Sequence, residues 1–301
     1  MSASAIAAAP AVETPFRRIV SDFGANPIAV LGLVLLGVIL LLALFAPLLS
    51  PQNPYDLAQL DVMDSRLPPG SASPAGGTFW LGTDDQGRDM LSAILYGLRI
   101  SLGVGVAATV LALLIGLATG LPAAYFGGRT ETLVMRIVDI QLSVPAILIA
   151  LILLAVLGQG VDKIVIALVT VQWAYYARTV RSSALVERQK EYIEAARVLA
   201  LGQARVVFRH LLPNCLPPLI VVATVQVAHA IALEATLSFL GLGLPITEPS
   251  LGLLISNGFQ YLLSGKYWIS FYPGLALLLT IMAINLVADQ LRDILNPRLR
   301  K

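Results

Sequence analysis

Residues 191–214 read EYIEAARVLALGQARVVFRHLLPN, a charged segment with helical spacing inside a largely apolar chain. Apolar stretches long enough to approach the thickness of a bilayer flank it on both sides. A membrane protein that places a charged helix outside the bilayer presents a surface to another molecule. The segment therefore predicts a polytopic membrane protein with a docking surface on one side of the membrane.

The composition of the chain supports a membrane location. Of its 301 residues, 57% are hydrophobic and 13% are charged, whereas a soluble chain is about 25% charged. The single cysteine, Cys215, excludes a disulfide framework and a cysteine-based metal cluster. The chain has no long acidic or basic tract, so nothing in it supports nucleic-acid binding.

Six apolar runs predict six membrane helices, an all-α fold and termini on one side of the membrane. The fourth run holds only 14 residues, but Lys163 and Arg178 at its ends can snorkel and lengthen the span. The first run is 22 residues long, longer than the hydrophobic region of a signal peptide, which favours a retained anchor. The six runs are 28–49, 100–126, 140–161, 164–177, 211–233 and 267–288.

The distribution of basic residues predicts the orientation. With a cytoplasmic N-terminus, 15 of the 20 Lys and Arg residues lie inside the cell. Four lie outside, namely Arg66, Arg88, Lys163 and Lys266, and Arg99 sits at a helix mouth. Because cytoplasmic loops carry the excess of Lys and Arg, both termini are expected to be cytoplasmic.

The chain divides into regions along these spans. Residues 1–15 are rich in Ala and Ser and are expected to be disordered. A capping box from Thr83 to Gln86 predicts the start of a short interfacial helix before the second span. The expected regions are a cytoplasmic tail over 1–26, the first span over 27–49, an extracytoplasmic loop over 50–96, a core of five spans over 97–290 and a second cytoplasmic tail over 291–301.

Two further segments have distinct packing signatures. Gly116 and Gly120 form G-x-x-x-G, which indicates close helix packing within the subunit. Residues 237–264 contain glycines, prolines and an apolar piece too short to cross the bilayer. We expect an external re-entrant or interfacial element there, lining a substrate gate.

The charged segment is expected to form two helices joined by a turn, over about 182–213. Gly202 is the expected stop of the first helix, and Pro213 that of a second helix in which Val206, Val207 and Phe208 face protein. Ala195 and Ala196 leave a small, smooth face that suits a partner's groove. Such a rigid hairpin could transmit displacement between molecules.

Several separated motifs, in order, resemble those of one protein family. Glu194-Ala195-Ala196, a following glycine and Leu212-Pro213 resemble the E-A-A–G–I-x-L-P pattern of ABC importer permeases. The chain from about residue 28 is similar to the C-type permeases of dipeptide and oligopeptide importers. The motifs shared with that branch are Leu81-Gly82-Thr83-Asp84, Gly87-Arg88-Asp89, Phe208-Arg209-His210, Leu212-Pro213-Asn214 and the run from Leu237 to Gly243.

The resemblance implies a type I ABC importer permease fold and a subunit that forms half of a peptide pore. The implied partners are a homologous second permease, two ABC ATPase subunits that use ATP and Mg, an extracytoplasmic binding protein and the lipid bilayer. The implied site residues are Glu194, Ala195, Ala196, Gly202, Arg205 and Pro213 in the ATPase-coupling loop, and Phe239, Gly241, Gly243 and Pro245 in the external gate.

The sequence departs from the family pattern at two places. The family glycine usually follows the Glu by six residues, where this chain has Ala200, and Gly202 comes two residues later. We therefore expect a shifted turn or an extended first helix. Where the family commonly has Trp-Gly after the gate segment, this chain has Leu251-Gly252.

The chain carries no motif for chemistry of its own. It has no G-x-x-x-x-G-K-[ST], H-E-x-x-H or G-x-S-x-G sequence, so we expect no catalytic site and no bound cofactor. His210 and His229 flank a predicted span, which argues against one metal site. Asp139 and Glu234, near span ends, are expected to form bonds between helices or to anchor the chain at the interface.

Three alternatives remain open at this stage. The same permease type also moves glutathione, nickel chelates and modified sugars. An ion-coupled secondary transporter would show inverted repeats and midplane charges, and no convincing repeat is visible. A membrane scaffold or channel would need neither the coupling hairpin nor the gate motifs.

Overall fold

The computed structural model describes residues 15–56, 60–73 and 76–295. Of these described residues, 77% are helical. Residues 1–14 and 296–301, which make up most of the two predicted tails, lie outside the described residues, and so does all but the last residue of the stretch 1–15 that was expected to be disordered. The described part of the N-terminal tail contains a helix that the sequence did not predict, α1 (Pro15–Gly24).

The elements follow in this order. The N-terminal part contains α2 (Pro27–Leu44), α3 (Ala46–Leu49), the 3-10 turn η2 (Val62–Asp64) and the strands β1 (Ser71–Ser73) and β2 (Gly77–Phe79). The middle contains α4 (Met90–Phe126), α5 (Gly128–Ser143), α6 (Ala146–Leu157), α7 (Val161–Glu187), α8 (Glu191–Val198) and α9 (Gln203–Arg205). The π-helical turn η3 (Val206–Leu211), α10 (Leu212–Phe239), α11 (Leu251–Phe259), η4 (Leu262–Ser264) and α12 (Trp268–Leu295) complete the described chain.

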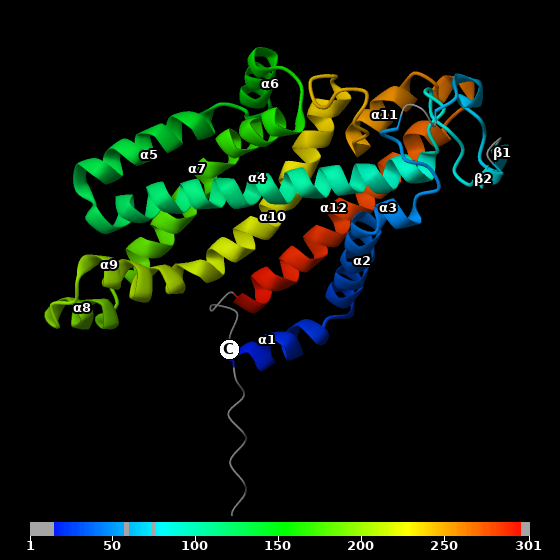
Figure 1. Ribbon diagram of the computed structural model, residues 1–301. Helices are drawn as coiled ribbons and strands as arrows, with labels where there is room; N and C mark the ends of the chain where they lie inside the picture. The colour runs from blue at the N-terminus through cyan, green and yellow to red at the C-terminus, as the bar shows by residue number, and fades with distance from the viewer. Residues whose placement is uncertain (1–14, 57–59, 74–75, 296–301) are drawn as a thin grey trace, which may run out of the picture.

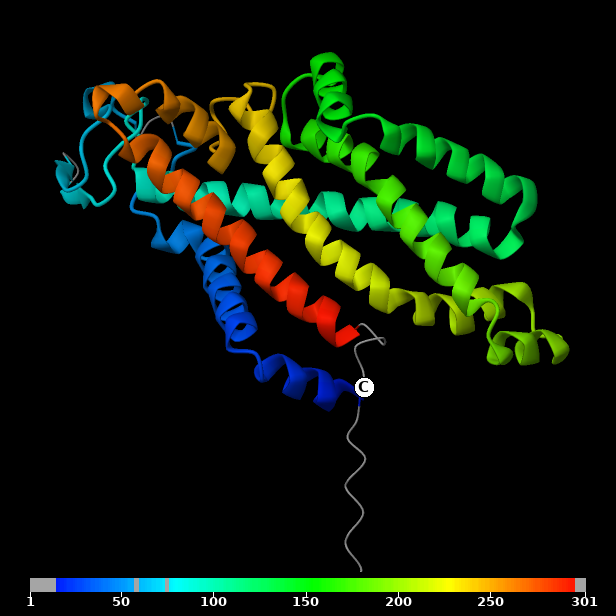
Figure 2. The ribbon, with the colours of Figure 1, turned by 180° about the vertical axis from the view of Figure 1, so that it is seen from behind.

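The long helices cross one another and pack into a single helical body (Figure 1). α4 packs against α7 and α10, and α12 packs against α2, α10 and α11. In both views α1, α8 and α9 lie toward one side, here called the hairpin side, together with the end of α12 (Figures 1 and 2). α6, α11 and the β1–β2 pair lie toward the opposite side, here called the loop side.

Four helical stretches of the described chain are long and apolar enough to cross a membrane: Pro27–Leu44, Met90–Phe126, Gln203–Phe239 and Trp268–Leu295. The pair α5 and α6 passes the same test together, with a 90° bend between the helices, which makes up to five spans. The six membrane spans predicted from the sequence are therefore not confirmed. α7 is 27 residues long, not 14, but polar residues such as Gln172, Arg178 and Arg181 lower its hydropathy.

The start of the second span differs from the prediction. Thr83 caps no helix, because its hydroxyl accepts from the Leu67 N–H at 2.7 Å and donates to the Asp64 carbonyl at 2.5 Å. Asp89 is the N-cap of α4, and its carboxylate accepts from the Ser92 N–H at 2.8 Å. The expected interfacial helix is therefore the buried first part of α4, and the predicted boundary at 96/97 falls inside that helix.

The predicted all-α fold has one small exception, because the loop between α3 and α4 contains the antiparallel pair β1–β2, with Ser71 opposite Phe79. The loop folds back on the helical body through Trp268, whose indole N–H donates to the Thr83 carbonyl at 3.2 Å. This bond joins α12 to the loop across 185 residues of sequence.

The close packing predicted for the G-x-x-x-G motif is confirmed, and the neighbour is α7. A Cβ atom added to Gly116 would lie 2.4 Å from the Tyr176 Cβ, and one added to Gly120 would lie 2.5 Å from the Ala177 carbonyl oxygen. The two glycines therefore allow the backbones of α4 and α7 to approach closely.

Candidate functional site: the coupling hairpin and the α7–α10 groove

The charged segment forms a helical hairpin at the end of α7, as predicted. Glu187 stabilises the turn between α7 and α8, because its carboxylate accepts hydrogen bonds from Lys190 Nζ and from the Tyr192 hydroxyl, each at 2.6 Å. Partial burial and the bond to Glu187 raise the pKa of Tyr192. Arg188 Nη1 donates to the carbonyls of Ala124 and Tyr125 at 2.9 and 3.1 Å, which fastens the end of α7 to α4.

The two faces of α8 have different roles. Ile193 and Ala196 are buried in a cluster with Val206 and Leu211. They therefore pack α8 against the start of the continuous helix formed by α9, η3 and α10, here called the α9–α10 rod. Glu194 and Ala195 are exposed. The expectation that Ala196 contributes to a docking face is therefore wrong, because the fold of the hairpin covers it.

The turn after α8 lies at Ala200 and not at Gly202. Ala200 has a φ of 53°, and the Leu201 N–H donates to the Ala196 carbonyl at 3.1 Å. This pattern closes a helix C-terminus in the left-handed conformation, usually with glycine. Gly202 has an ordinary φ of −58°. The predicted shift and helix extension are therefore wrong, because Ala200 adopts the conformation that the family glycine would adopt.

No second short helix is separated from the fifth span. α9, η3 and α10 form one continuous stretch, Gln203–Phe239. Pro213 lies in its interior, just after the π-helical turn, and does not end it. Proline has no N–H to donate to a preceding carbonyl of the helix. The wider π-helical turn before Pro213 accommodates the loss of that hydrogen bond. The hairpin is thereby joined to α10 without a break, and Arg205 is exposed on this rod.

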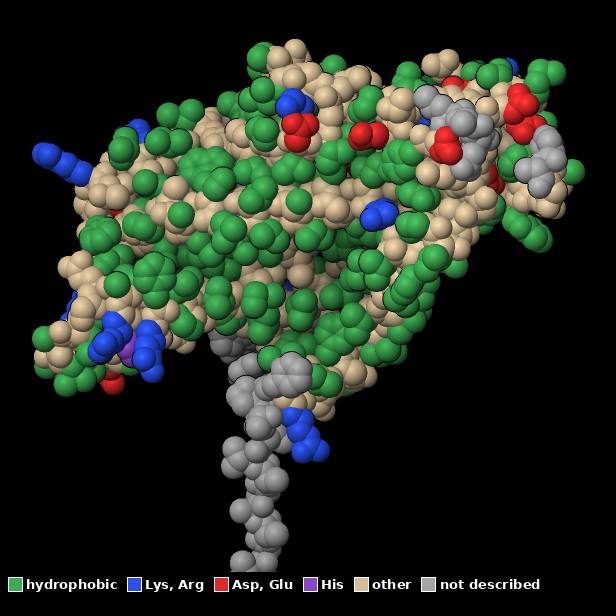
Figure 3. Space-filling view, viewed as in Figure 1, with side chains coloured by type: hydrophobic (Ala, Val, Ile, Leu, Met, Phe, Trp, Pro, Cys, Tyr) green, Lys and Arg blue, Asp and Glu red, His purple; other side chains and the backbone are tan. Residues whose placement is uncertain are grey.

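The hairpin exposes apolar residues that were not predicted to take part in docking. Val198 is 86% exposed, Leu199 72% and Phe208 65%. Phe208 was expected to face protein, and the π-helical turn directs it outward instead. Basic side chains and a histidine gather beside α8 and α9 on the face in Figure 3, whereas hydrophobic side chains cover most of its middle.

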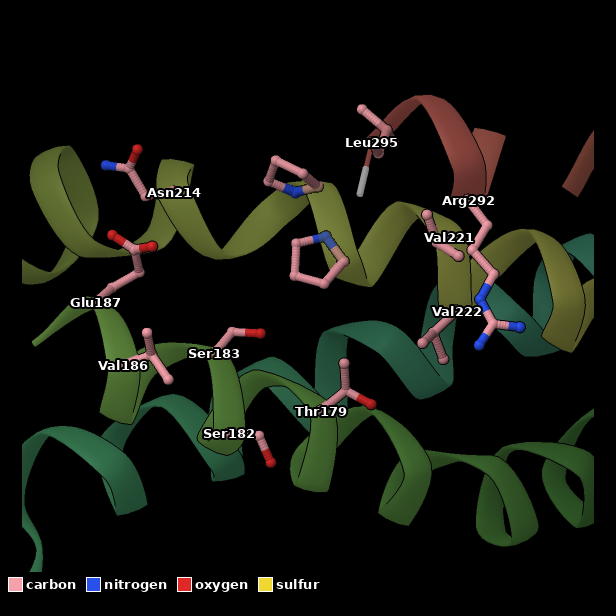
Figure 4. Close-up of a pocket in the computed structure, with 12 residues that line it drawn as sticks. Thr179, Ser182, Ser183, Val186, Glu187, Asn214, Val221, Val222, Arg292 and Leu295 are labelled. Atoms are coloured by element: carbon pink, nitrogen blue, oxygen red, sulfur yellow. The ribbon is translucent and has the colours of Figure 1, made fainter. Parts of the chain in front are cut away.

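α7 and α10 form a groove with two cavities along it. The larger, of 710 Å³, lies at the hairpin end, and Arg292 enters it from α12 (Figure 4). The smaller, of 410 Å³, lies toward the loop side. Thr179 and Val222 in the larger cavity are one helical turn from Tyr175 and Gln226 in the smaller. The cavities therefore follow one another along the same helix pair.

The acidic groups of the spans bond between helices, as predicted. Glu234, fully buried on α10, accepts from Ser101 Oγ on α4 at 2.9 Å and from Ser238 Oγ at 2.8 Å. Asp139 on α5 pairs with Arg178 on α7. These bonds fix the helices that form the groove.

The predicted gate segment follows α10 on the loop side. Gly241 has a φ of 80°, and its carbonyl accepts from Gln159 Nε2 at 2.8 Å. Phe239 contacts Phe259 of α11 edge to face, with ring centroids 5.7 Å apart. Gly243 packs against Ser238, and Pro245 begins the turn to Glu248. The segment is thus held between the α6–α7 turn and α11.

A buried ion pair and a hydrogen bond connect the loop between α3 and α4 to this predicted gate segment. Arg88 and Asp84 have fully buried side chains, with Arg88 Nε 2.6 Å from Asp84 Oδ2. Arg88 Nη1 also donates to the Ile246 carbonyl at 3.1 Å. Asp84 and Arg88 belong to two of the motifs found in the sequence, but no feature of the sequence linked either residue to Ile246.

Comparison with known proteins identifies the family. Residues 112–301 match the model described as binding-protein-dependent transport system inner membrane component. The chain belongs to this family. Residues 14–69 match the N-terminal TM domain of oligopeptide transport permease C.

The relatives of this permease include proteins named as permeases of peptide transport systems. It is 39% identical over 297 residues to the dipeptide transport system permease protein DppC of Escherichia coli K12, covering 98% of this chain and 97% of that one. It is 38% identical over 279 residues to the oligopeptide permease OppC of Bacillus subtilis, covering 93% and 88%. A putative peptide transport permease of Brucella suis is 40% identical over 270 residues, covering 90% and 88%.

Solved structures place the permease in the type I ABC importer permease fold. The inward-facing MetNI methionine ABC transporter matches with a TM-score of 0.55 and 23% identity, over 68% of this chain and 97% of that one. An amino acid ABC transporter matches with a TM-score of 0.51 and 15% identity, over 65% and 91%.

Proposed function

We propose that the chain is the membrane-spanning permease subunit of an ATP-driven importer and forms half of the pore for di- and oligopeptides. The observation that carries this proposal is the exposed hairpin, which continues into both helices of the α7–α10 groove. The names of the relatives support peptides as the cargo. Glutathione, a nickel chelate or a modified sugar would use the same permease type.

In this proposal the chain crosses the inner membrane six times, with both termini cytoplasmic. The bent α5–α6 pair and α7 supply the third and fourth spans. α1, the end of α12 and the hairpin all lie on one side of the molecule, and most Lys and Arg residues fall in segments assigned to that side.

Two ABC ATPase subunits, which bind the ATP and Mg, dock on the hairpin. Glu194 supplies a charge, and Ala195, Val198, Leu199 and Phe208 supply small or apolar contacts. Because α8 is packed on the α9–α10 rod, a displacement of the hairpin moves α7 and α10 together. That movement opens the groove alternately to the two sides of the membrane.

A homologous second permease covers the open side of the groove and completes the pore. The extracytoplasmic binding protein delivers cargo to the loop-side surface formed by the segments 50–89 and 240–266. The buried pair of Arg88 and Asp84 makes these two segments one surface.

The test is uptake by the complete complex reconstituted in vesicles, with the double variant E194K/A195W. Both positions are exposed, so the variant is expected to assemble normally but to lose peptide uptake and stimulated ATP hydrolysis by at least about tenfold. D162K, at the exposed loop-side end of α7, is the matched charge-reversal control. Normal uptake by E194K/A195W would contradict the docking role, and wild-type uptake without the ATPases would favour a secondary transporter.

A further inference from the structure

Two glutamine side chains of the smaller cavity are arranged in an unusual way. Gln172 on α7 is 3% exposed and Gln226 on α10 is 5% exposed. Gln172 Nε2 donates to the backbone carbonyl of Gln226 at 3.0 Å, which fixes its amide plane. Among the described residues, Gln172 Oε1 and Gln226 Nε2 have no hydrogen-bond partner. Buried polar groups normally find partners, so two such atoms on side chains that line one cavity point to a ligand.

The two free atoms have complementary chemistry. Gln172 Oε1 is an acceptor and Gln226 Nε2 is a donor, and both side chains line the same 410 Å³ cavity. A peptide group offers one N–H donor and one C=O acceptor, which matches this pair. The rest of the lining is mixed, with polar groups from Tyr175, His229 and Thr236 beside apolar side chains.

We propose that the smaller cavity is a binding subsite for a peptide group of the cargo. Gln172 Oε1 accepts from the cargo N–H, and Gln226 Nε2 donates to the cargo C=O. The inference rests on the proposed transport function and narrows its cargo to compounds that contain an amide. It also assigns a substrate contact to residues that no motif of the chain singles out.

The position of the cavity suits cargo on its way through the groove. Thr236, at its loop-side end, is one turn before Phe239 of the gate segment. At the other end, Gln226 is one turn from Val222 of the larger cavity. Cargo that passes the gate segment therefore meets the two glutamines before it reaches the larger cavity.

The test compares a dipeptide with its ester analogue, in which an ester oxygen replaces the amide N–H. Wild-type and variant complexes, reconstituted in vesicles, receive each compound from saturated binding protein, so selection by the binding protein is the same throughout. Wild type is expected to transport the dipeptide about three- to tenfold faster than the ester, the effect of one lost hydrogen bond. Q172M, which lacks the acceptor for the N–H, is expected to lose that preference.

Q226M keeps the acceptor and is expected to retain the preference for the amide while transporting both compounds more slowly. T170V is the matched control on α7, because the Thr170 hydroxyl bonds to the Ile166 carbonyl of its own helix and does not line the cavity. An unchanged preference in Q172M, or full peptide uptake by Q172M/Q226M, would overturn the subsite. No ATP-dependent dipeptide uptake by wild type would instead overturn the proposed function.

Discussion

Ala200 holds a left-handed backbone conformation at the turn that follows α8, with a φ of 53°. This conformation costs a non-glycine residue about 1 kcal/mol, because its Cβ crowds the backbone. We expect Ala200→Gly to stabilise the hairpin by about that amount. The measurement is hydrogen exchange of the α8 amides, which should slow in the variant.

The neighbouring position gives the matched control. Leu199 has a φ of −72°, so glycine relieves no strain there. Leu199→Gly is expected to speed exchange in α8, because glycine adds freedom to the unfolded chain. Faster exchange in Ala200→Gly as well would show that the turn does not hold Ala200 in the strained conformation.

Asp85, in the loop between α3 and α4, makes the stability of the protein depend on pH. Burial, and then the neighbouring charge of Asp84, raise the pKa of the Asp85 carboxyl above its ordinary value. The folded state therefore binds the Asp85 proton more tightly than the unfolded chain does. Protonation of Asp85 stabilises the folded state at low pH, and this stabilisation is lost as the pH rises through the raised pKa.

The measurement is the thermal midpoint of wild type and Asp85→Asn from about pH 4 upward, where carboxyl groups titrate. Wild type should lose more stability than Asp85→Asn over this range, since asparagine cannot ionise. Parallel curves would show that Asp85 titrates alike in the folded and unfolded chain.

Ion pairs between neighbouring residues follow from helical spacing, as in the pairing of Glu187 with Lys190. The orientations of Ala196 and Phe208 were not predicted correctly, because both depend on how α8 packs on a rod with a π-helical turn. Residue spacing assumes regular helices, and such a turn rotates every side chain after it.

At the scale of elements, the crossing of α4 and α7 depends on Gly120. An added Cβ would lie 2.5 Å from both the Ala177 carbonyl oxygen and Val180 Cγ1. We expect Gly120→Ala to destabilise the protein by about 1–3 kcal/mol, because the two backbones must separate. The thermal midpoint of the purified protein in detergent measures this change.

Gly103 on the same helix is the control, since a Cβ atom added there would have no neighbouring atom within 4 Å outside its own helical turn. Gly103→Ala should be neutral or stabilising by about 0.5–1 kcal/mol, because alanine favours a helix. Equal effects of the two substitutions would mean that close approach at Gly120 does not limit the packing.

The elements themselves were predicted unevenly. The apolar run 140–161 looks like one span, but Val144 is extended before Pro145, and the chain turns by 90° there. In α10, by contrast, Pro217 and Pro218 lie within a continuous helix. A proline ends or bends a helix depending on whether neighbouring turns adapt to its missing N–H, and hydropathy does not report this.

At the scale of the whole molecule, Arg88 joins the loop between α3 and α4 to the segment that follows α10. Its removal would leave Asp84 as a buried charge without its partner, so we expect Arg88→Met to cost about 3–5 kcal/mol. Arg99→Met, at an exposed position of α4, should change stability by at most about 0.5 kcal/mol. Thermal unfolding measures both, and similar midpoints for the two variants would contradict the bridging role.

Apolar run lengths, the bias of basic residues and the ordered motifs were enough to predict the family, the membrane location and the presence of a charged helical hairpin, because these properties depend on consecutive residues. The turn at Ala200, the buried face of Ala196, the bond from Arg88 to Ile246 and the pairing of Gln172 with Gln226 emerged only from the fold. Each depends on a backbone conformation or on residues that are distant in sequence, and contacts of this kind exist only once the helices have packed.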